Sequence, residues 1–287
     1  KIVSTVSLET LLRLAKAERP DGTGAVPDIF SLRRLDLFSY NEFLSFTHKP
    51  AGEQAVNEFL SRGAFPGLIK TGHTEALHQL YTEILCKDAV IAGGIRDRNT
   101  LQRMALHLIT NTGEPVTANK LREKLKIKAV STAAEHMQCI ETAGLVRFVS
   151  ILSDNPARQA VNPRKVYAVD TALAAAVSTA ETVDRNKLFE TMLFNHLCRE
   201  SRSVCYTNEQ GGCDFIASDA EGGVRCVRAC YEDGPDRGQT KTVGWLWALR
   251  ETGSSRGTIV TADRNDRIDA ENFEIEVIDA DTFLGGY

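Results

Sequence analysis

Two carboxylates in the last third of the chain have the residue type and the placement to hold a metal ion. Glu190 falls in a predicted helix over residues 187–201, and Asp214 falls in a predicted strand over residues 213–217. A helix acid and a strand acid that converge can ligate Mg²⁺, which activates a water molecule and stabilises a pentavalent phosphate. The pair therefore indicates phosphodiester chemistry, provided that further groups complete the site.

The next predicted strand, residues 224–230, does not supply those groups. Metal-dependent nucleases of the restriction-endonuclease type carry an acid-x-Lys triplet there, whereas this sequence has Arg228-Ala229-Cys230. A guanidinium cannot replace a metal-binding carboxylate, and a thiol is a poor partner for Mg²⁺. The only lysine after Asp214 is Lys241, which lies outside the strand. We expect Glu190, Asp214 and Arg228 to be remnants of a nuclease site that holds no metal; an active Mg²⁺-dependent nuclease is the alternative.

A cluster of basic side chains occupies the middle of the chain, on a predicted helix and the turn that follows it. Its members are Lys120, Arg122, Lys124, Lys126 and Lys128. Such a cluster contacts phosphate groups and gives salt-sensitive binding that does not read base sequence. The next predicted helix has no lysine or arginine and offers Ser131 and Thr132, which is poor equipment for base readout. Two interpretations stay open: contact with DNA phosphates, or packing and docking of a protein partner.

The charge distribution singles out the same segment. The 287 residues include 34 basic and 38 acidic side chains, a formal net charge of −4, which excludes a histone-like polycation. Residues 101–170 carry ten basic and six acidic side chains, whereas residues 171–287 carry twelve and twenty. The middle segment is therefore the one with an electrostatic reason to meet phosphate.

That middle segment, residues 99–170, has the predicted element order of a winged helix. The expected elements are helices over about 101–108, 117–125 and 131–142, and strands over 145–152 and 165–169. Asn111-Thr112-Gly113 ends the first helix, and Thr117 is placed to cap the second. Three helices followed by a β-hairpin form the winged version of the helix-turn-helix.

The flanking segments alternate between helix and strand. Before residue 99 we expect strands over 1–7 and within 32–37, and helices over 8–18, 41–46 and 74–91. After residue 170 we expect helices over 187–201 and around 245–249, and strands over 204–206, 213–217, 224–230, 257–261 and 273–278. Ser39 and Glu42 form a capping-box pattern, and the run from Gly63 to Gly67 predicts a break. Because the chain opens directly on a strand, we expect it to be a fragment whose sheet has further strands upstream.

Several classes of protein are excluded by what the sequence lacks. No apolar run of about 18 residues is present, which predicts no membrane span. The seven cysteines are odd in number and form no C-x-x-C pair, which predicts reduced thiols in a cytoplasmic protein. No G-x-x-x-x-G-K-[ST] loop is present, so this chain is not expected to bind ATP by itself.

Nine short stretches of the sequence, taken in order along the chain, carry a resemblance to a known family. They are Ile2–Ser7, Leu35–Leu44, Gly63–Pro66, Lys87-Asp88, Asn111–Gly113, Pro163–Asp170, Leu188–Leu197, Cys213–Phe215 and Val227–Tyr231. In order and spacing they resemble a family of prokaryotic AAA-type ATPases that end in a long uncharacterised domain. The resemblance covers essentially the whole chain and implies a nucleotide-binding half upstream, where ATP and Mg²⁺ would bind. It also implies that Thr5 and Ser7 stand at a strand tip that senses the γ-phosphate, although Val6 stands where the family has glycine.

Together these observations predict a mixed α/β protein in three parts. We expect a remnant of an AAA-type α/β domain with a helical lid at 1–98, a winged helix-turn-helix at 99–170, and an inactive restriction-endonuclease-like domain at 171–287. The predicted role is that of the C-terminal part of an AAA-type ATPase, which binds DNA or a protein partner and has no ATPase activity of its own. A Mg²⁺-dependent nuclease and a non-enzymatic DNA-binding regulator are the alternatives.

Overall fold

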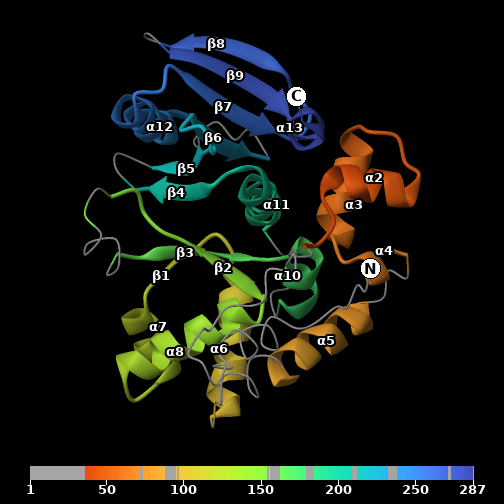
Figure 1. Ribbon diagram of the computed structural model, residues 1–287, viewed down its shortest axis with the longest axis vertical. Helices are drawn as coiled ribbons and strands as arrows, with labels where there is room; N and C mark the ends of the chain where they lie inside the picture. The colour runs from red at the N-terminus through yellow and green to blue at the C-terminus, as the bar shows by residue number, and fades with distance from the viewer. Residues whose placement is uncertain are drawn as a thin grey trace, which may run out of the picture.

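A computed structural model places most of the chain after residue 35. It describes residues 36–70, 74–87, 95, 97–153, 155, 162–178, 184–208, 212–231, 238–270 and 273–286, with the backbone alone for 238–244 and 268–270. The fold is mixed α/β, and the described residues form a three-stranded and a six-stranded sheet. The six-stranded sheet lies at one end of the molecule and the three-stranded sheet lies near its middle (Figure 1). The strand and helix expected over residues 1–18 fall outside the described residues.

The first described segment is helical. Its elements are α2 (Tyr40–Thr47), α3 (Glu53–Arg62), α4 (Pro66–Ile69) and α5 (Thr74–Glu83). The capping box is confirmed, since Ser39 Oγ accepts from Glu42 N and Glu42 Oε2 accepts from Ser39 N. The break after α3 is confirmed at Gly63. The strand expected within 32–37 is wrong for its described part: residues 36–39 form a loop in which Phe38 N donates to Ala64 O, 3.0 Å away, so no sheet partner is needed.

The middle segment has the predicted helices and hairpin. Its elements are α6 (Arg98–Thr110), β1 (Pro115–Val116), α7 (Ala118–Leu125), α8 (Val130–Thr142), β2 (Val146–Val149) and β3 (Arg164–Ala168). All strand pairs in its sheet are antiparallel, in the order β1-β3-β2. Thr117 caps α7 as expected, because its side chain accepts from Lys120 N. The two-residue strand β1 was not predicted, since a run that short has no periodicity.

The last segment builds the larger sheet. Its elements are α10 (Thr171–Val177), α11 (Arg185–Glu200), β4 (Ser203–Thr207), β5 (Cys213–Ser218), β6 (Val224–Cys230), α12 (Gly238–Thr252), β7 (Arg256–Thr261), β8 (Asp266–Ala270), β9 (Phe273–Asp279) and α13 (Ala280–Gly285). The strand order is β4-β5-β6-β7-β9-β8. Strands β4, β5 and β6 form an antiparallel meander, and β7 then runs parallel to β6 after α12.

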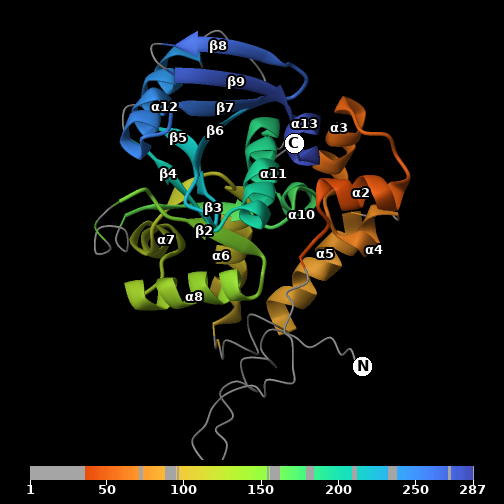
Figure 2. The same cartoon turned by 45° about the horizontal axis from the view of Figure 1, so that its top comes forward.

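Helices α11 and α12 cover opposite faces of this sheet (Figure 2). Phe215 and Val227 belong to the main core, which also holds the apolar face of α11. Ile216 and Cys226 belong to a separate small core with Trp245 of α12. This alternation along β5 and β6 is the pattern of strands that are buried on both faces.

The end of the chain packs against its first described helices. Asp281 of α13 accepts hydrogen bonds from the Tyr40 hydroxyl (2.5 Å) and from Gly52 N (2.6 Å). The main core runs from Tyr40 to Leu284 and includes residues of all three segments. Among the described residues, no helix combines the length and apolar composition needed to cross a bilayer.

Candidate functional site

Glu190 projects from α11 toward the three-stranded sheet. The helix begins after Asp184, whose side chain accepts from Asn186 N at 2.9 Å. Phe189 and Leu193 are fully buried on this helix and fix its orientation against the core. The Glu190 side chain is 15% exposed, so the helix delivers a carboxylate into a nearly closed space.

Asp214 reaches the same space from β5. Its side chain is 11% exposed, and its Oδ2 accepts a hydrogen bond from Ala229 N of β6 at 3.1 Å. That bond holds the carboxylate against the neighbouring strand, so its other oxygen faces a partner outside the sheet. The structure thus brings together the two acids that the sequence singled out.

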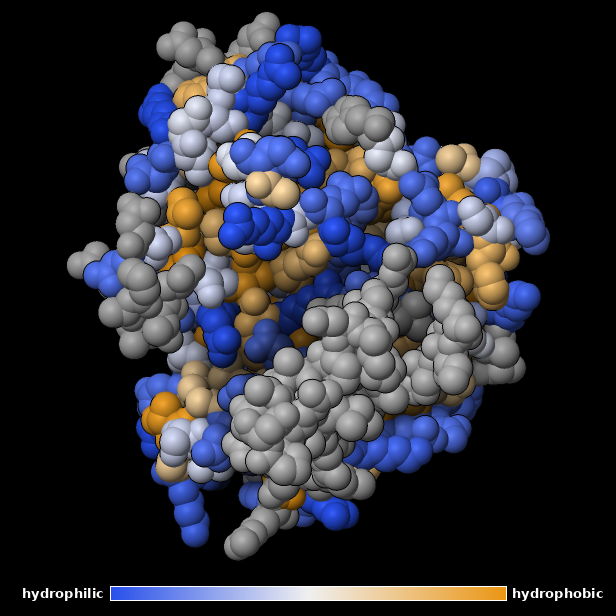
Figure 3. Space-filling view, viewed as in Figure 1, coloured by the Kyte–Doolittle hydropathy of each residue, from blue (hydrophilic) through white to orange (hydrophobic). Residues whose placement is uncertain are grey.

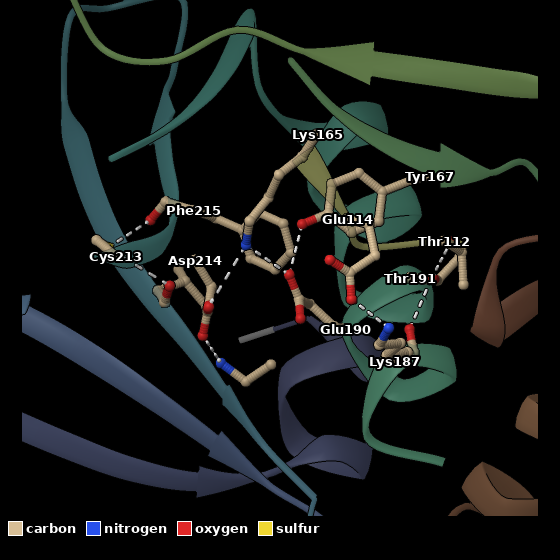
Figure 4. A network of polar contacts seen from close by, with 12 residues as sticks. Thr112, Glu114, Lys165, Tyr167, Lys187, Glu190, Thr191, Cys213, Asp214 and Phe215 are labelled. Carbon is tan, nitrogen blue, oxygen red and sulfur yellow. Dashed lines mark hydrogen bonds and ion pairs between the residues drawn. The ribbon is translucent and has the colours of Figure 1, made fainter. Parts of the chain in front are cut away.

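A lysine from the three-stranded sheet lies between the two acids (Figure 4). Lys165 Nζ is 2.9 Å from Glu190 Oε1 and 3.7 Å from Asp214 Oδ1. Burial alone would lower the pKa of Lys165, but attraction to Glu190 and Asp214 outweighs burial and raises that pKa above its ordinary value. Lys165 is therefore a fixed positive charge between two carboxylates at neutral pH.

Tyr167 contacts the same carboxylate oxygen. Its hydroxyl donates to Glu190 Oε1 at 2.5 Å, and its ring stacks on Phe194 with centroids 4.3 Å apart. Burial and the negative charge of Glu190 both raise the pKa of Tyr167 well above 10, so the hydroxyl stays a donor. Lys165 and Tyr167 are two residues apart on β3, and strand alternation sends both side chains to one face.

Two further contacts join α11 to the middle segment. Lys187 forms an ion pair with Glu114. The hydroxyls of Thr112 and Thr191 lie 2.7 Å apart, and Thr112 Oγ1 accepts from Ala168 N. The Glu190–Lys165 pair is therefore the centre of a polar interface between two segments of the chain.

Arg228 lies on β6 beside Ala229, with 7% of its surface exposed. Among the described residues, no group of three or more histidine, cysteine, aspartate or glutamate side chains could hold a metal ion. Mg²⁺ needs several oxygen ligands at about 2.0–2.1 Å. Two carboxylates with an ammonium between them do not fit that requirement.

The sequence prediction missed Lys165 and Tyr167. The sequence did contain a signal for them. Lys165 and Tyr167 are two residues apart in a predicted strand, so strand alternation puts both polar side chains on the same face. A lysine that is buried in this way needs a carboxylate partner. The sequence does not show which carboxylate pairs with Lys165, because both acids lie in the last segment and their distance from Lys165 depends on the tertiary fold.

The basic cluster is where the sequence placed it, on α7 and the following turn. Lys120, Lys124, Lys126 and Lys128 are exposed. Arg122 is half-buried and forms an ion pair with Glu123 at 3.0 Å. Leu121 and Leu125 are buried on the opposite side of the helix, so packing of these leucines forces the lysines outward.

The next helix, α8, offers a different surface. Ser131 is exposed and Thr132 is half-buried, and the exposed side chains after them include Glu135 and Gln138. Val130 at the start of α8 is a large apolar residue with 44% of its surface exposed. On the face drawn in Figure 3, hydrophilic residues predominate and hydrophobic ones show in separated spots.

A cavity of about 220 Å³ lies where the first segment meets α10 and α11. Its polar lining includes Asp170, Arg147 and Arg199. Arg147 pairs with Asp36 at 3.3 Å, and Arg199 pairs with Glu42 at 3.2 Å. Both guanidinium groups that line the cavity are therefore paired with carboxylates of the first segment. Thr5 and Ser7, the sensor-like residues of the sequence prediction, lie outside the described residues.

Comparison with known proteins gives one match. No curated protein and no solved structure matches the chain significantly. Residues 53–184 are similar to a family whose model is described as a domain of unknown function (DUF8612). The matched stretch starts at the first residue of α3 and ends at the residue that caps α11, so it includes Lys165 but neither Glu190 nor Asp214.

Proposed function

We propose that this chain binds the phosphate backbone of double-stranded DNA through α7, as the C-terminal part of an AAA-type ATPase. The order α6-β1-α7-α8-β2-β3, with sheet order β1-β3-β2, supports this proposal, because three helices followed by a β-hairpin are expected of a winged helix-turn-helix. In such a unit α8 takes the place of the recognition helix, and α7 lies beside it.

The observation that carries the proposal is the set of four exposed ammonium groups on α7 and the turn after it. These belong to Lys120, Lys124, Lys126 and Lys128. Among the residues that the structure describes, none of the four forms an ion pair, whereas Lys49, Lys165 and Lys187 all do. Neutralising DNA phosphates releases condensed counterions, which favours binding at low salt.

Contact with phosphates rather than bases follows from the composition of α8. From Val130 to Thr142 this helix has no lysine or arginine, and its exposed Glu135 would repel DNA. Bidentate base contacts are typically made by arginine, lysine, asparagine or glutamine, and Gln138 is the one such residue on this helix. We therefore expect binding that is weakly selective for sequence.

The test is the salt dependence of duplex binding, measured by fluorescence anisotropy with a labelled 20-base-pair DNA. The variant is Lys120→Ala with Lys124→Ala, and the matched control is Lys49→Ala with Lys87→Ala, two lysines of the first segment. Each lost phosphate contact reduces the slope of log K against log salt by about 0.9, so the α7 variant should lose about 2 units of slope.

The control variant should keep the wild-type slope. A wild-type chain that fails to bind the duplex at 50 mM salt contradicts the proposal, and so does an α7 variant with unchanged slope. In either case the exposed face of α7 would be better explained as a docking surface for a protein partner.

The ATPase part of the proposal concerns the parent protein, and this chain is expected to bind no nucleotide. Its sequence has no Walker loop. Calorimetric titration of the chain with ATP and Mg²⁺ should give no binding heat, and a saturable heat would contradict the assignment.

A second candidate function, Mg²⁺-dependent cleavage of DNA, is supported by the convergence of Glu190 and Asp214. The order α11-β4-β5-β6-α12-β7 is that expected of a restriction-endonuclease-like domain. It ranks second because Lys165 lies between the two acids. Incubation with plasmid and Mg²⁺ or Mn²⁺ separates the two functions: cleavage that Asp214→Asn abolishes favours the nuclease, and uncut plasmid excludes it.

A further inference from the structure

The cation that lies between Glu190 and Asp214 is a side chain of the protein itself, the ammonium of Lys165. The Lys165 ammonium lies 2.9 Å from Glu190 Oε1 and 3.7 Å from Asp214 Oδ1. Both carboxylates are at most 15% exposed. A divalent ion and this ammonium cannot share one space, because like charges in a buried site repel strongly.

We propose that Lys165 occupies the cation position of the Glu190–Asp214 pair, so that this pair binds the β2–β3 hairpin of its own chain in place of a metal ion. The lysine comes from β3 of the middle segment, whereas the two acids come from α11 and β5 of the last segment. The contact that fills the cation position is therefore the same contact that fixes the hairpin to the larger sheet.

The surrounding groups hold both carboxylates in place around the ammonium. Tyr167 donates to the same Glu190 oxygen that accepts from Lys165. Ala229 N fixes the remaining Asp214 oxygen. With Lys165 removed, two carboxylates would face one small space, and water molecules would complete the oxygen ligands that Mn²⁺ or Mg²⁺ needs.

The experiment replaces the ammonium and asks whether a metal takes its place. Wild type, Lys165→Ala and a matched control, Lys187→Ala, are titrated with Mn²⁺ and followed by electron paramagnetic resonance of the free ion. Lys187 also spans the two segments, through Glu114, but leaves the Glu190–Asp214 pair intact. Lys165→Ala should bind one Mn²⁺ per chain, whereas wild type and Lys187→Ala should bind none.

Thermal unfolding supplies an independent readout. A ligand at 100 times its Kd stabilises the folded state enough to raise the unfolding midpoint of a chain this size by about 4–5 °C. That rise should appear in Lys165→Ala with Mn²⁺ and vanish in the double variant Lys165→Ala with Asp214→Asn. If Lys165→Ala folds only when Mn²⁺ is present, the same conclusion holds.

Three results would overturn the proposal. Saturable Mn²⁺ binding by wild type would mean that Lys165 does not fill the cation position. A folded Lys165→Ala that ignores Mn²⁺ would mean that the two carboxylates are not a cation site. If Lys165→Ala fails to fold with or without Mn²⁺, Lys165→Gln, which keeps a neutral donor for Glu190, takes its place, and a lack of Mn²⁺ response there is equally decisive. The result does not depend on whether α7 binds DNA.

Discussion

The carboxylate of Asp170 fills the space beside Gly63, so that a Cβ at residue 63 would overlap both carboxylate oxygens. The same carboxylate accepts from Ala64 N at 2.5 Å and from Leu173 N at 2.7 Å. Asp170 is thus the N-cap of α10 and also the anchor for the turn after α3. One buried side chain joins the first segment to the end of the middle segment.

Gly63→Ala should strongly destabilise the protein. Gly63 has φ 70° and ψ −163°, a region that glycine alone adopts without strain of about 1–3 kcal/mol, and the added methyl would also collide with Asp170. Gly67→Ala is the matched control, because nothing lies within 4 Å of its Cβ position and it sits in helix α4. Urea unfolding should show a loss of at least about 2 kcal/mol for Gly63→Ala and a small gain for Gly67→Ala. Equal effects would contradict the assigned role of Gly63.

The stability of the protein should depend on pH through Asp170. Burial raises the pKa of Asp170 from 3.8 to about 6, although the backbone N–H groups of Ala64 and Leu173 oppose the shift. Because the pKa is higher in the folded chain than in the unfolded chain, the stabilising contribution is complete below about pH 3.8 and is lost as the pH rises through about 6.

Comparison with Asp170→Asn isolates that contribution, since asparagine does not titrate. The free energy of unfolding of wild type, minus that of the variant, should fall by about 2.4 kcal/mol between pH 4 and pH 7. Urea unfolding at four pH values in that range measures it. A difference that stays constant with pH would show that Asp170 titrates at its ordinary value.

Tyr40→Phe should weaken the contact between the two ends of the described chain. The Tyr40 hydroxyl donates to Asp281 at 2.5 Å, and burial followed by the charge of Asp281 raises the pKa of Tyr40. Loss of a hydrogen bond to a charged group such as this half-buried carboxylate costs about 1.5–3 kcal/mol. Tyr81→Phe is the control, because the Tyr81 hydroxyl is 3.4 Å from Gln102 O, near the limit of a hydrogen bond. Chemical unfolding that fails to distinguish the two variants would refute the special role of Tyr40.

Thr117→Ala should destabilise α7 and, with it, the surface that presents the lysines. Thr117 Oγ1 accepts from Lys120 N at 3.1 Å, and removal of such a cap costs about 1 kcal/mol. Ser131→Ala alters an exposed hydroxyl on α8 and should stay within about 0.5 kcal/mol of wild type. Hydrogen exchange of the amides at the start of α7 gives the local readout. Unchanged protection in Thr117→Ala would contradict the cap.

Local signals were sufficient to predict the start of α2 and most elements of the middle segment. The Ser39–Glu42 capping box and the Thr117 cap are contacts between residues three apart, so their geometry follows from the helix itself. The parallel pairing of β6 with β7 is different, because it joins residues about 30 positions apart in the chain, such as Cys226 and Gly257. Strand β8 begins with the charged pair Asp266-Arg267, and its sequence alone gave no strand prediction.

The sequence by itself determined that an acid would stand on a helix at Glu190, that another would stand on a strand at Asp214, and that a basic cluster would lie on α7 and the turn after it. These are consequences of residue type and of the 3.6 and 2.0 periodicities. Only the tertiary structure decided that Lys165 would lie between the two acids. That contact depends on how the three-stranded sheet packs against α11 and β5, and such packing is set by the shapes of whole faces rather than by the spacing of residues along either segment.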